Sequence, residues 1–133
     1  MDKDYIEQGV DFNCLPEIVF KAWLDSKQHG EMIDGNAKIE PIVGGNFSIW
    51  DASITGITTK IDKTKLLIEQ DWRYDYDDWP KAEPSKLTLQ FLPITGGTKM
   101  VLKQTNIPNK YKEDIADGWN AYYYKPMSLY FNK

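Results

Sequence analysis

The sequence contains a single cysteine, Cys14, and a single histidine, His29. One cysteine excludes an intrachain disulfide, and the two residues together fall short of the ligand set that a zinc site needs. A Ser-His-Asp or Cys-His catalytic arrangement would have to use His29, which stands beside Gly30 near the end of an expected short helix. We expect a surface or capping role for His29, and we expect neither a metal nor a cofactor.

A basic stripe and a long apolar run are also absent. Lys and Arg number 16 against 20 Asp and Glu, for a formal net charge of -4, which disfavours nucleic acid because phosphate binding needs clustered cations. No window approaches the roughly 18 apolar residues that span a bilayer, and the N-terminus leads into no apolar signal core. We expect a cytoplasmic protein with neither nucleic-acid nor membrane partners.

The motifs that would bind calcium or phosphate are incomplete. Asp75, Asp77, Asp78 and Glu83 are close in sequence, but the segment lacks the Gly and closing Glu of an EF-hand at the required spacing. It is interpreted as a solvated loop. The pairs Gly44-Gly45 and Gly96-Gly97 open no helix, unlike a phosphate-binding loop, and are interpreted as turns.

Aromatic residues are plentiful, with five Trp, eight Tyr and five Phe among 133 residues. A chain of this length is most simply one domain, residues 1–133, with a core of its own. Aromatic side chains combine large apolar area with a polar edge, so they suit a core, a cavity wall or a binding face.

Periodicity and turn signals predict two helices followed mainly by strands. A first strand is expected over Tyr5–Asn13, a helix over Pro16–Asp25 and a short helix over Ser26–Glu31. Six further strands are predicted at Lys38–Pro41, Asn46–Asp51, Ile54–Ile61, Lys65–Tyr74, Ser85–Leu92 and Lys99–Asn106. The short turns between them favour an antiparallel meander, and alternating apolar residues give it one dry face, which includes Leu87, Leu89, Phe91, Met100 and Leu102.

A long helix is predicted from Tyr111 to Phe131, covering the dry face of the sheet. Steps of three or four place six residues on one helix face: Ile115, Trp119, Tyr122, Pro126, Leu129 and Tyr130. Gly118 and Pro126 weaken a helix interior, so the helix must be held by packing, and Pro126 should kink it. Alternation along the preceding sheet places Trp72 toward this helix and Arg73 on the other side.

Several short motifs, in this order along the chain, give a resemblance to a known family. They are Pro16-Glu17-Ile18-Val19-Phe20-Lys21-Ala22, Gly44-Gly45-Asn46-Phe47-Ser48-Ile49, Gly56, Trp72-Arg73, Trp79-Pro80, Gly97-Thr98, Ile107-Pro108, Gly118-Trp119 and Tyr122-Tyr123. The chain resembles the C-terminal domain of the activator of the heat-shock protein 90 ATPase, within the START-like (SRPBCC) superfamily. The resemblance implies an α+β helix-grip fold, similar to Bet v 1, in which a curved antiparallel sheet wraps around a long C-terminal helix.

The resemblance implies less about activity than about fold. The eukaryotic activator has a separate N-terminal domain that does much of the chaperone binding, and 133 residues leave no room for it. We expect a non-enzymatic protein that binds a small apolar or aromatic ligand between sheet and helix. The alternatives are a chaperone-associated stress-response protein with a protein partner, and a polyketide cyclase or aromatase. The residues expected to line the cavity are Ile68, Trp72, Leu89, Phe91, Met100, Trp119, Tyr122 and Tyr123.

Overall fold

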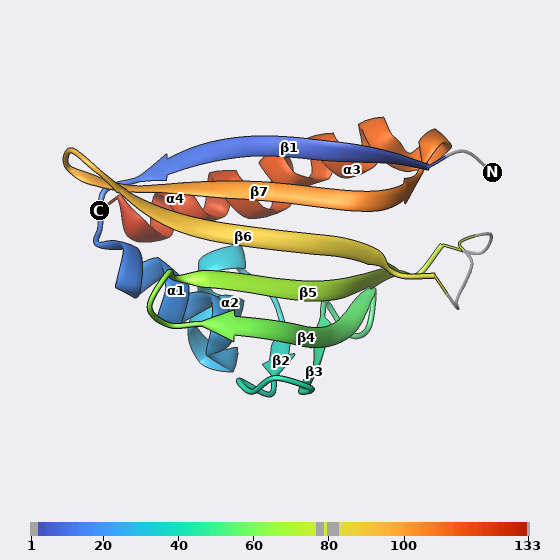
Figure 1. The fold of residues 1–133 in the computed structure, drawn as a ribbon, viewed down its shortest axis with the longest axis horizontal. Coiled ribbons are helices and arrows are strands. Elements are labelled where there is room, and N and C mark those ends of the chain that lie inside the picture. Colours follow the sequence, from blue (N-terminus) through green and yellow to red (C-terminus); the bar gives the residue numbers. More distant parts are fainter. Residues whose placement is uncertain (1–2, 77–78, 80–82, 133) are drawn as a thin grey trace.

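Seven antiparallel strands form one curved sheet in the computed structural model, which describes residues 3–76, 79 and 83–132 (Figure 1). The strand order across the sheet is β1-β7-β6-β5-β4-β3-β2. The strands are β1 (Lys3–Phe12), β2 (Ala37–Ile39), β3 (Asn46–Ile49), β4 (Ile54–Asp62), β5 (Leu67–Tyr74), β6 (Ser85–Ile94) and β7 (Gly97–Pro108). The expected meander is confirmed, and no predicted strand end differs from the structure by more than two residues.

The first strand forms one edge of the sheet and pairs with the last strand. β1 lies antiparallel to β7, with Phe12 opposite Thr98. The two strands approach closely here, because a Cβ on Gly97 would collide with the carbonyl oxygen of Phe12. Only glycine fits at this point of the β6–β7 hairpin.

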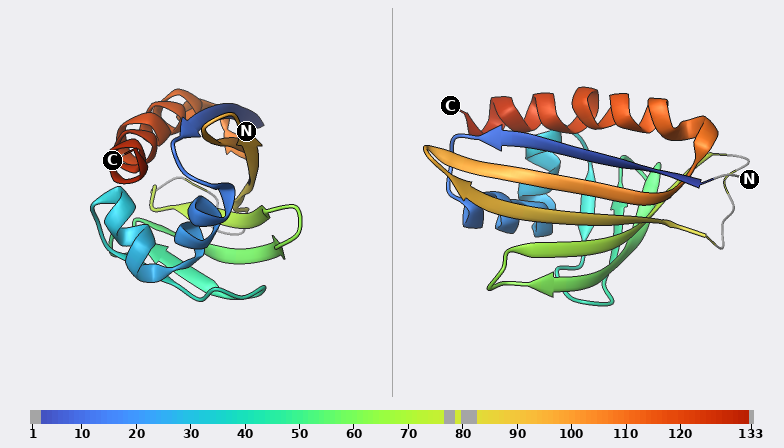
Figure 2. Two further views of the ribbon diagram at one scale, coloured as in Figure 1. Left: turned by 90° about the vertical axis from the view of Figure 1, so that its left-hand side faces the viewer. Right: turned by 45° about the horizontal axis from the view of Figure 1, so that its top comes forward.

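Two short helices cover one end of the sheet. They are α1 (Pro16–Leu24), which packs on β6 and β7, and α2 (Ser26–Ile33), which packs on the C-terminal helix. Phe20 of α1 meets Phe91 of β6 edge to face, with ring centroids 5.8 Å apart. The last helix was the one element expected to cover the dry face of the sheet, and this expectation is wrong because α1 covers part of that face (Figure 2).

The C-terminal helix runs along the open side of the curved sheet and completes the helix grip (Figure 2). After a 3₁₀ turn, η1 (Asn109–Tyr111), it consists of α3 (Lys112–Gly118), a π-helical segment η2 (Trp119–Tyr124) and α4 (Lys125–Phe131). The Lys125 N–H bonds the carbonyl of Asn120, five residues back. We attribute this wider turn to Pro126, which has no N–H and whose ring excludes the carbonyl four residues before it.

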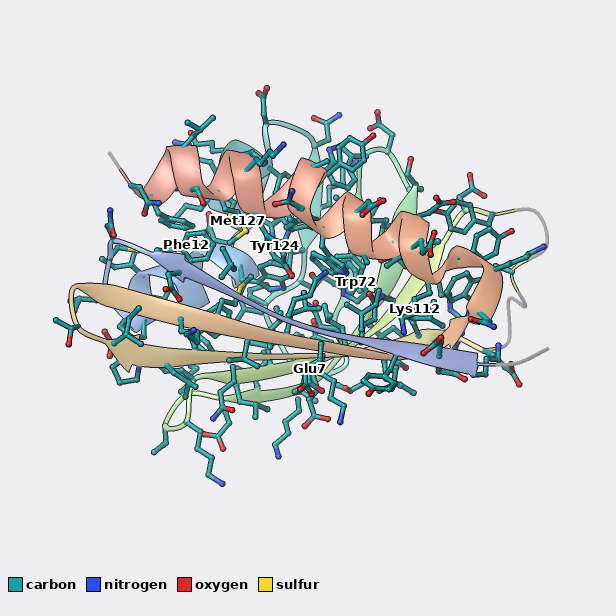
Figure 3. All side chains as sticks on the ribbon, turned by 90° about the horizontal axis from the view of Figure 1, so that it is seen from above. Glu7, Phe12, Trp72, Lys112, Tyr124 and Met127 are labelled. Atoms are coloured by element: carbon teal, nitrogen blue, oxygen red, sulfur yellow. The ribbon has the colours of Figure 1, made fainter. Side chains whose placement is uncertain are left out.

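The π-helical segment changes which residues face the sheet. The buried residues of the helix are Ile115, Trp119, Tyr123, Tyr124 and Met127. Figure 3 shows two of them, Tyr124 and Met127, on the side of the helix that faces the sheet. Tyr122 is 64% exposed and Leu129 is 77% exposed, so the predicted helix face is wrong for both. The physical reason is that a π turn holds more residues than an α turn, and it moves the inward positions one residue along the chain.

The concave face of the sheet is packed with apolar side chains. Leu87, Leu89, Phe91, Met100 and Leu102 are at most 1% exposed, as their alternation predicts. Among the described residues, no helix combines the length and the apolar character required to cross a membrane.

Candidate functional site

A partly open pocket of about 530 Å³ lies between β5 and the first half of the C-terminal helix. The turn between β3 and β4 forms its third side. Its lining residues are Trp50, Ser53, Ile54, Trp72, Tyr74, Asp75, Tyr76, Asp114, Ile115, Gly118, Trp119, Tyr122 and Tyr123. Figure 3 shows Trp72 between the C-terminal helix and the sheet. The lining is therefore mostly aromatic, as in sites that hold small organic molecules.

Half of the residues predicted to line a cavity do line this pocket: Trp72, Trp119, Tyr122 and Tyr123. The other four, Ile68, Leu89, Phe91 and Met100, are at most 1% exposed and belong to the close-packed core, away from the pocket. The space thus lies toward the end of β5 rather than along the whole helix. Sequence reasoning missed three aromatic lining residues, Trp50, Tyr74 and Tyr76.

Two buried glutamines hold the indole rings beside the pocket. Gln70 Oε1 accepts hydrogen bonds from Trp72 Nε1 at 2.9 Å and from Trp23 Nε1 at 3.2 Å. Gln104 Oε1 accepts from Trp119 Nε1 at 2.8 Å. Because each indole N–H is already bonded, the rings of Trp72 and Trp119 present their apolar surfaces to the pocket.

The glutamines are themselves fixed by further hydrogen bonds. Gln70 Nε2 donates to Thr58 Oγ1 at 3.0 Å, and Gln104 Nε2 donates to Ser85 Oγ at 3.0 Å and to Tyr74 Oη at 3.2 Å. A satisfied network of this kind orients the rings before any ligand arrives. The signal in the sequence is a glutamine on an otherwise apolar strand face, at both positions.

His29 is 1% exposed, so the expected surface position is wrong, and its ring contacts a backbone carbonyl in the last turn of α1. Its Nδ1 lies 2.7 Å from the carbonyl oxygen of Trp23 and its Nε2 lies 2.8 Å from Tyr123 Oη. Burial lowers the His29 pKa to about 4. The neutral ring therefore donates from Nδ1 to the carbonyl and accepts the Tyr123 hydroxyl proton at Nε2.

The hydrogen bond between His29 and Tyr123 supports the pocket wall, and it does not serve proton exchange between the two side chains. Burial raises the Tyr123 pKa well above its usual value, while it lowers that of His29. Both shifts oppose transfer of the phenol proton to the imidazole, because transfer would create two buried charges. The pair fixes Tyr123, whose ring lies 4.8 Å from that of Trp119.

The turn at the pocket edge has an unusual backbone. Trp50, Asp51 and Ala52 all have positive φ angles, of 51°, 54° and 72°. Left-handed conformations cost non-glycine residues roughly 1–2 kcal/mol each, and such strain often marks functional segments. The Trp50 N–H bonds the Asn36 carbonyl at 2.9 Å, and the indole lies so close to Gly35 that a Cβ there would overlap it.

We expect Ala52→Gly to raise the free energy of unfolding by about 0.5–1 kcal/mol, because glycine adopts φ near +70° without strain. Urea denaturation measures the change. Ala121→Gly is the matched control, since Ala121 is exposed and helical and should lose about 1 kcal/mol. A loss of stability in Ala52→Gly would contradict the assignment of strain to this turn.

The charged residues of the pocket are both acidic. Asp75 and Asp114 lie at its mouth as exposed residues, and no Lys, Arg or His from the described part of the chain belongs to the lining. Within the described ranges, no three His, Cys, Asp or Glu side chains form a group that could hold a metal ion. Asp77 and Asp78 lie outside those ranges, so the interpretation of their loop as solvated is a prediction still.

Comparison with known proteins gives a family match over most of the chain. The model of the family described as "Activator of Hsp90 ATPase homolog 1-like protein" matches residues 13–132. The crystal structure of an HSP90 activator from Plasmodium falciparum is 27% identical, with a TM-score of 0.84 and coverage of 96% of each chain. The family resemblance and the fold expected from it are thus confirmed.

More distant solved structures share the fold alone. A protein from Chromobacterium violaceum is 19% identical with a TM-score of 0.78 and 97% of each chain covered. Ara h 8.0201 is 13% identical with a TM-score of 0.75 and 98% of each chain covered. No curated protein sequence matches the chain.

Proposed function

The chain belongs to the family of Activator of Hsp90 ATPase homolog 1-like proteins, and from this premise we propose that it is a non-enzymatic protein that binds a small apolar or aromatic ligand. The observation that carries the proposal is the aromatic pocket of about 530 Å³ under the π-helical segment. This volume lies within the range typical of small-molecule sites. Rings held in place by Gln70 and Gln104 lose little entropy when a ligand enters.

Binding without turnover agrees with the chemistry of the lining. A nucleophile activated by a base needs a hydrogen-bonded pair that shares its proton readily. The pair that reaches the pocket, Tyr123 with His29, has pKa values shifted apart in the directions that prevent this. Ser53 Oγ donates to the Trp50 carbonyl at 2.9 Å, within the strained turn. These contacts support a role in shaping the pocket.

Gly118→Leu should abolish ligand binding while the protein stays folded. Gly118 lines the pocket, and a Cβ added there meets Tyr122 Cδ2 at an ordinary 3.7 Å. The leucine side chain then enters the space, and replacement of a helical glycine stabilises the helix by up to about 1 kcal/mol. Tryptophan fluorescence and calorimetry with fatty acids, naphthalene and naphthyl alcohols measure binding.

Gly118→Ala is the matched control, because it also stabilises the helix by replacing a glycine and fills little of the pocket. We expect saturable binding by the wild type, affinity within about twofold in Gly118→Ala, and a loss of at least tenfold in Gly118→Leu. If no apolar or aromatic compound binds the wild type, the proposal is wrong. Unchanged affinity in Gly118→Leu would place the ligand elsewhere.

A protein partner of the Hsp90 chaperone class is the second candidate function. It is supported by the family and by the 27% identity to an HSP90 activator over 96% of each chain. The measurement is Hsp90 ATPase activity with and without the purified chain, together with coprecipitation of the two proteins. A rise in the ATPase rate that saturates with added chain would support this function. If the rate does not rise and the two proteins do not coprecipitate, this candidate function is wrong.

A further inference from the structure

We propose that the pocket selects ligands in which an aromatic body carries one cationic group, held at the mouth by Asp75 and Asp114. This inference rests on the proposed ligand-binding function of the same pocket and names the chemical class of its ligand. An alkyl-linked aromatic amine is the simplest compound of this class.

The first argument is the charge of the lining. Asp75 and Asp114 are its charged residues, and neither forms an ion pair with any described residue. Lys112 is close to Asp114 in sequence, but it forms an ion pair with Asp4 at 3.1 Å and a cation–π contact with the ring of Tyr5. The mouth therefore holds two negative charges that no ion pair with a described side chain neutralises, so a bound cation would be attracted there.

The second argument is the position of Asp114 beside an aromatic wall. Asp114 lies in the first turn of α3 and lines the pocket together with Tyr76. It also acts on Tyr76, whose pKa is raised first by burial and then by the Asp114 charge. The carboxylate and the phenol ring are thus near neighbours at the mouth.

The third argument is the arrangement of the rings behind the carboxylates. Tyr76 is stacked between Tyr74 and Tyr111, with ring centroids 5.7 and 4.3 Å away, so its own faces are covered. Trp50 and Tyr122 meet edge to face at 6.1 Å, an arrangement that leaves ring surface uncovered by this pair. The faces of Trp and Tyr rings attract a cation electrostatically. Carboxylates together with ring faces favour an ammonium group over a neutral one.

The same geometry disfavours anions and multiply charged compounds. The indole N–H groups of Trp72 and Trp119 point to Gln70 and Gln104, so they offer no hydrogen bond to a carboxylate ligand. A second charge on the ligand would have to enter the apolar interior, where an unpaired charge is costly to desolvate.

The test uses three matched naphthalene compounds: 2-(1-naphthyl)ethylamine, 2-(1-naphthyl)ethanol and 1-naphthylacetate, with calorimetry at pH 7. We expect the amine to bind about tenfold more tightly than the alcohol, and the acetate to bind more weakly than both. Asp75→Asn and Asp114→Asn should each weaken amine binding about two- to fivefold and leave alcohol binding unchanged. Added salt should weaken the binding of the amine and leave the binding of the alcohol unchanged.

Asp117→Asn is the control variant, because Asp117 is exposed on the same helix and does not line the pocket. It should leave all three affinities unchanged. Equal binding of amine and alcohol, or an amine preference that survives both pocket variants, overturns the cation inference while the pocket remains a binding site. If none of the three compounds binds, the proposed function fails together with the inference built on it.

Discussion

Trp119→Ala is expected to lower the free energy of unfolding by about 3–5 kcal/mol, as measured by urea denaturation. Trp119 is 3% exposed, and its ring lies 5.0 Å from Trp72 and 4.8 Å from Tyr123. Truncation removes this packing, opens a void next to the pocket and leaves Gln104 Oε1 without its 2.8 Å donor. A loss of this size is a large part of the 5–15 kcal/mol typical of a domain.

Two further variants separate packing from hydrogen bonding and test the helix register. Trp119→Phe keeps an aromatic ring and removes the N–H, so its cost should be nearer the 1–3 kcal/mol of an unsatisfied buried acceptor. Tyr122→Ala removes a ring of comparable size from the exposed face of the same helix and should cost less than about 1 kcal/mol. Equal losses in Trp119→Ala and Tyr122→Ala would contradict the π-helical register.

The strands could be predicted from sequence because strand alternation is a local property. Leu87, Leu89 and Phe91 alternate with polar residues, and this pattern by itself identifies the buried face. The pairing of β1 with β7 joins the first and last strands in the sequence, and no turn connects them. It could not be obtained from turn signals, which report only on neighbouring strands.

The helix face was predicted one residue out of register after Trp119. A period of 3.6 applies to an α-helix, and the sequence pattern was interpreted with that period through to Tyr130. The π turn ahead of Pro126 breaks the period, so Tyr123, Tyr124 and Met127 face inward. A proline inside a helical pattern was recognised, but whether it produces a kink or a π turn depends on the packing around it.

Four of the eight residues expected at the cavity line this pocket, and the other four lie deeper in the core. Leu89 and Met100 were expected at the cavity because they share the dry face of the sheet. Helix α1 fills the space above part of that face, with Phe20 against Phe91. The position at which a helix packs on a sheet depends on tertiary structure. The alternation pattern of a single strand therefore could not distinguish close-packed residues from pocket-lining residues.

Acid should destabilise the protein by about 3 kcal/mol between pH 6.5 and pH 4, because His29 is buried in its neutral form. An unfolded chain protonates this histidine below its ordinary pKa of 6.5, whereas the folded pKa is about 4. In this window the unfolded state binds more protons, so stability falls as pH falls, by about 1.36 kcal/mol per unit. Above pH 6.5 neither state binds the proton, and below pH 4 both do, so the contribution of His29 is flat outside the window.

Urea denaturation at constant ionic strength from pH 7 to pH 4 measures this slope, and two variants assign it. His29→Gln removes the titrating group, so it should be less stable at pH 7 yet lack most of the slope. Tyr123→Phe removes the hydroxyl bonded to Nε2 and keeps the buried imidazole, so the slope should persist. The carboxyls of Asp4 and Asp62 have pKa values lowered from 3.8. The stability that they contribute is therefore lost below the pH range in which His29 acts. An equal slope in His29→Gln and the wild type would show that another group titrates, because a side chain without a proton to bind cannot link stability to pH.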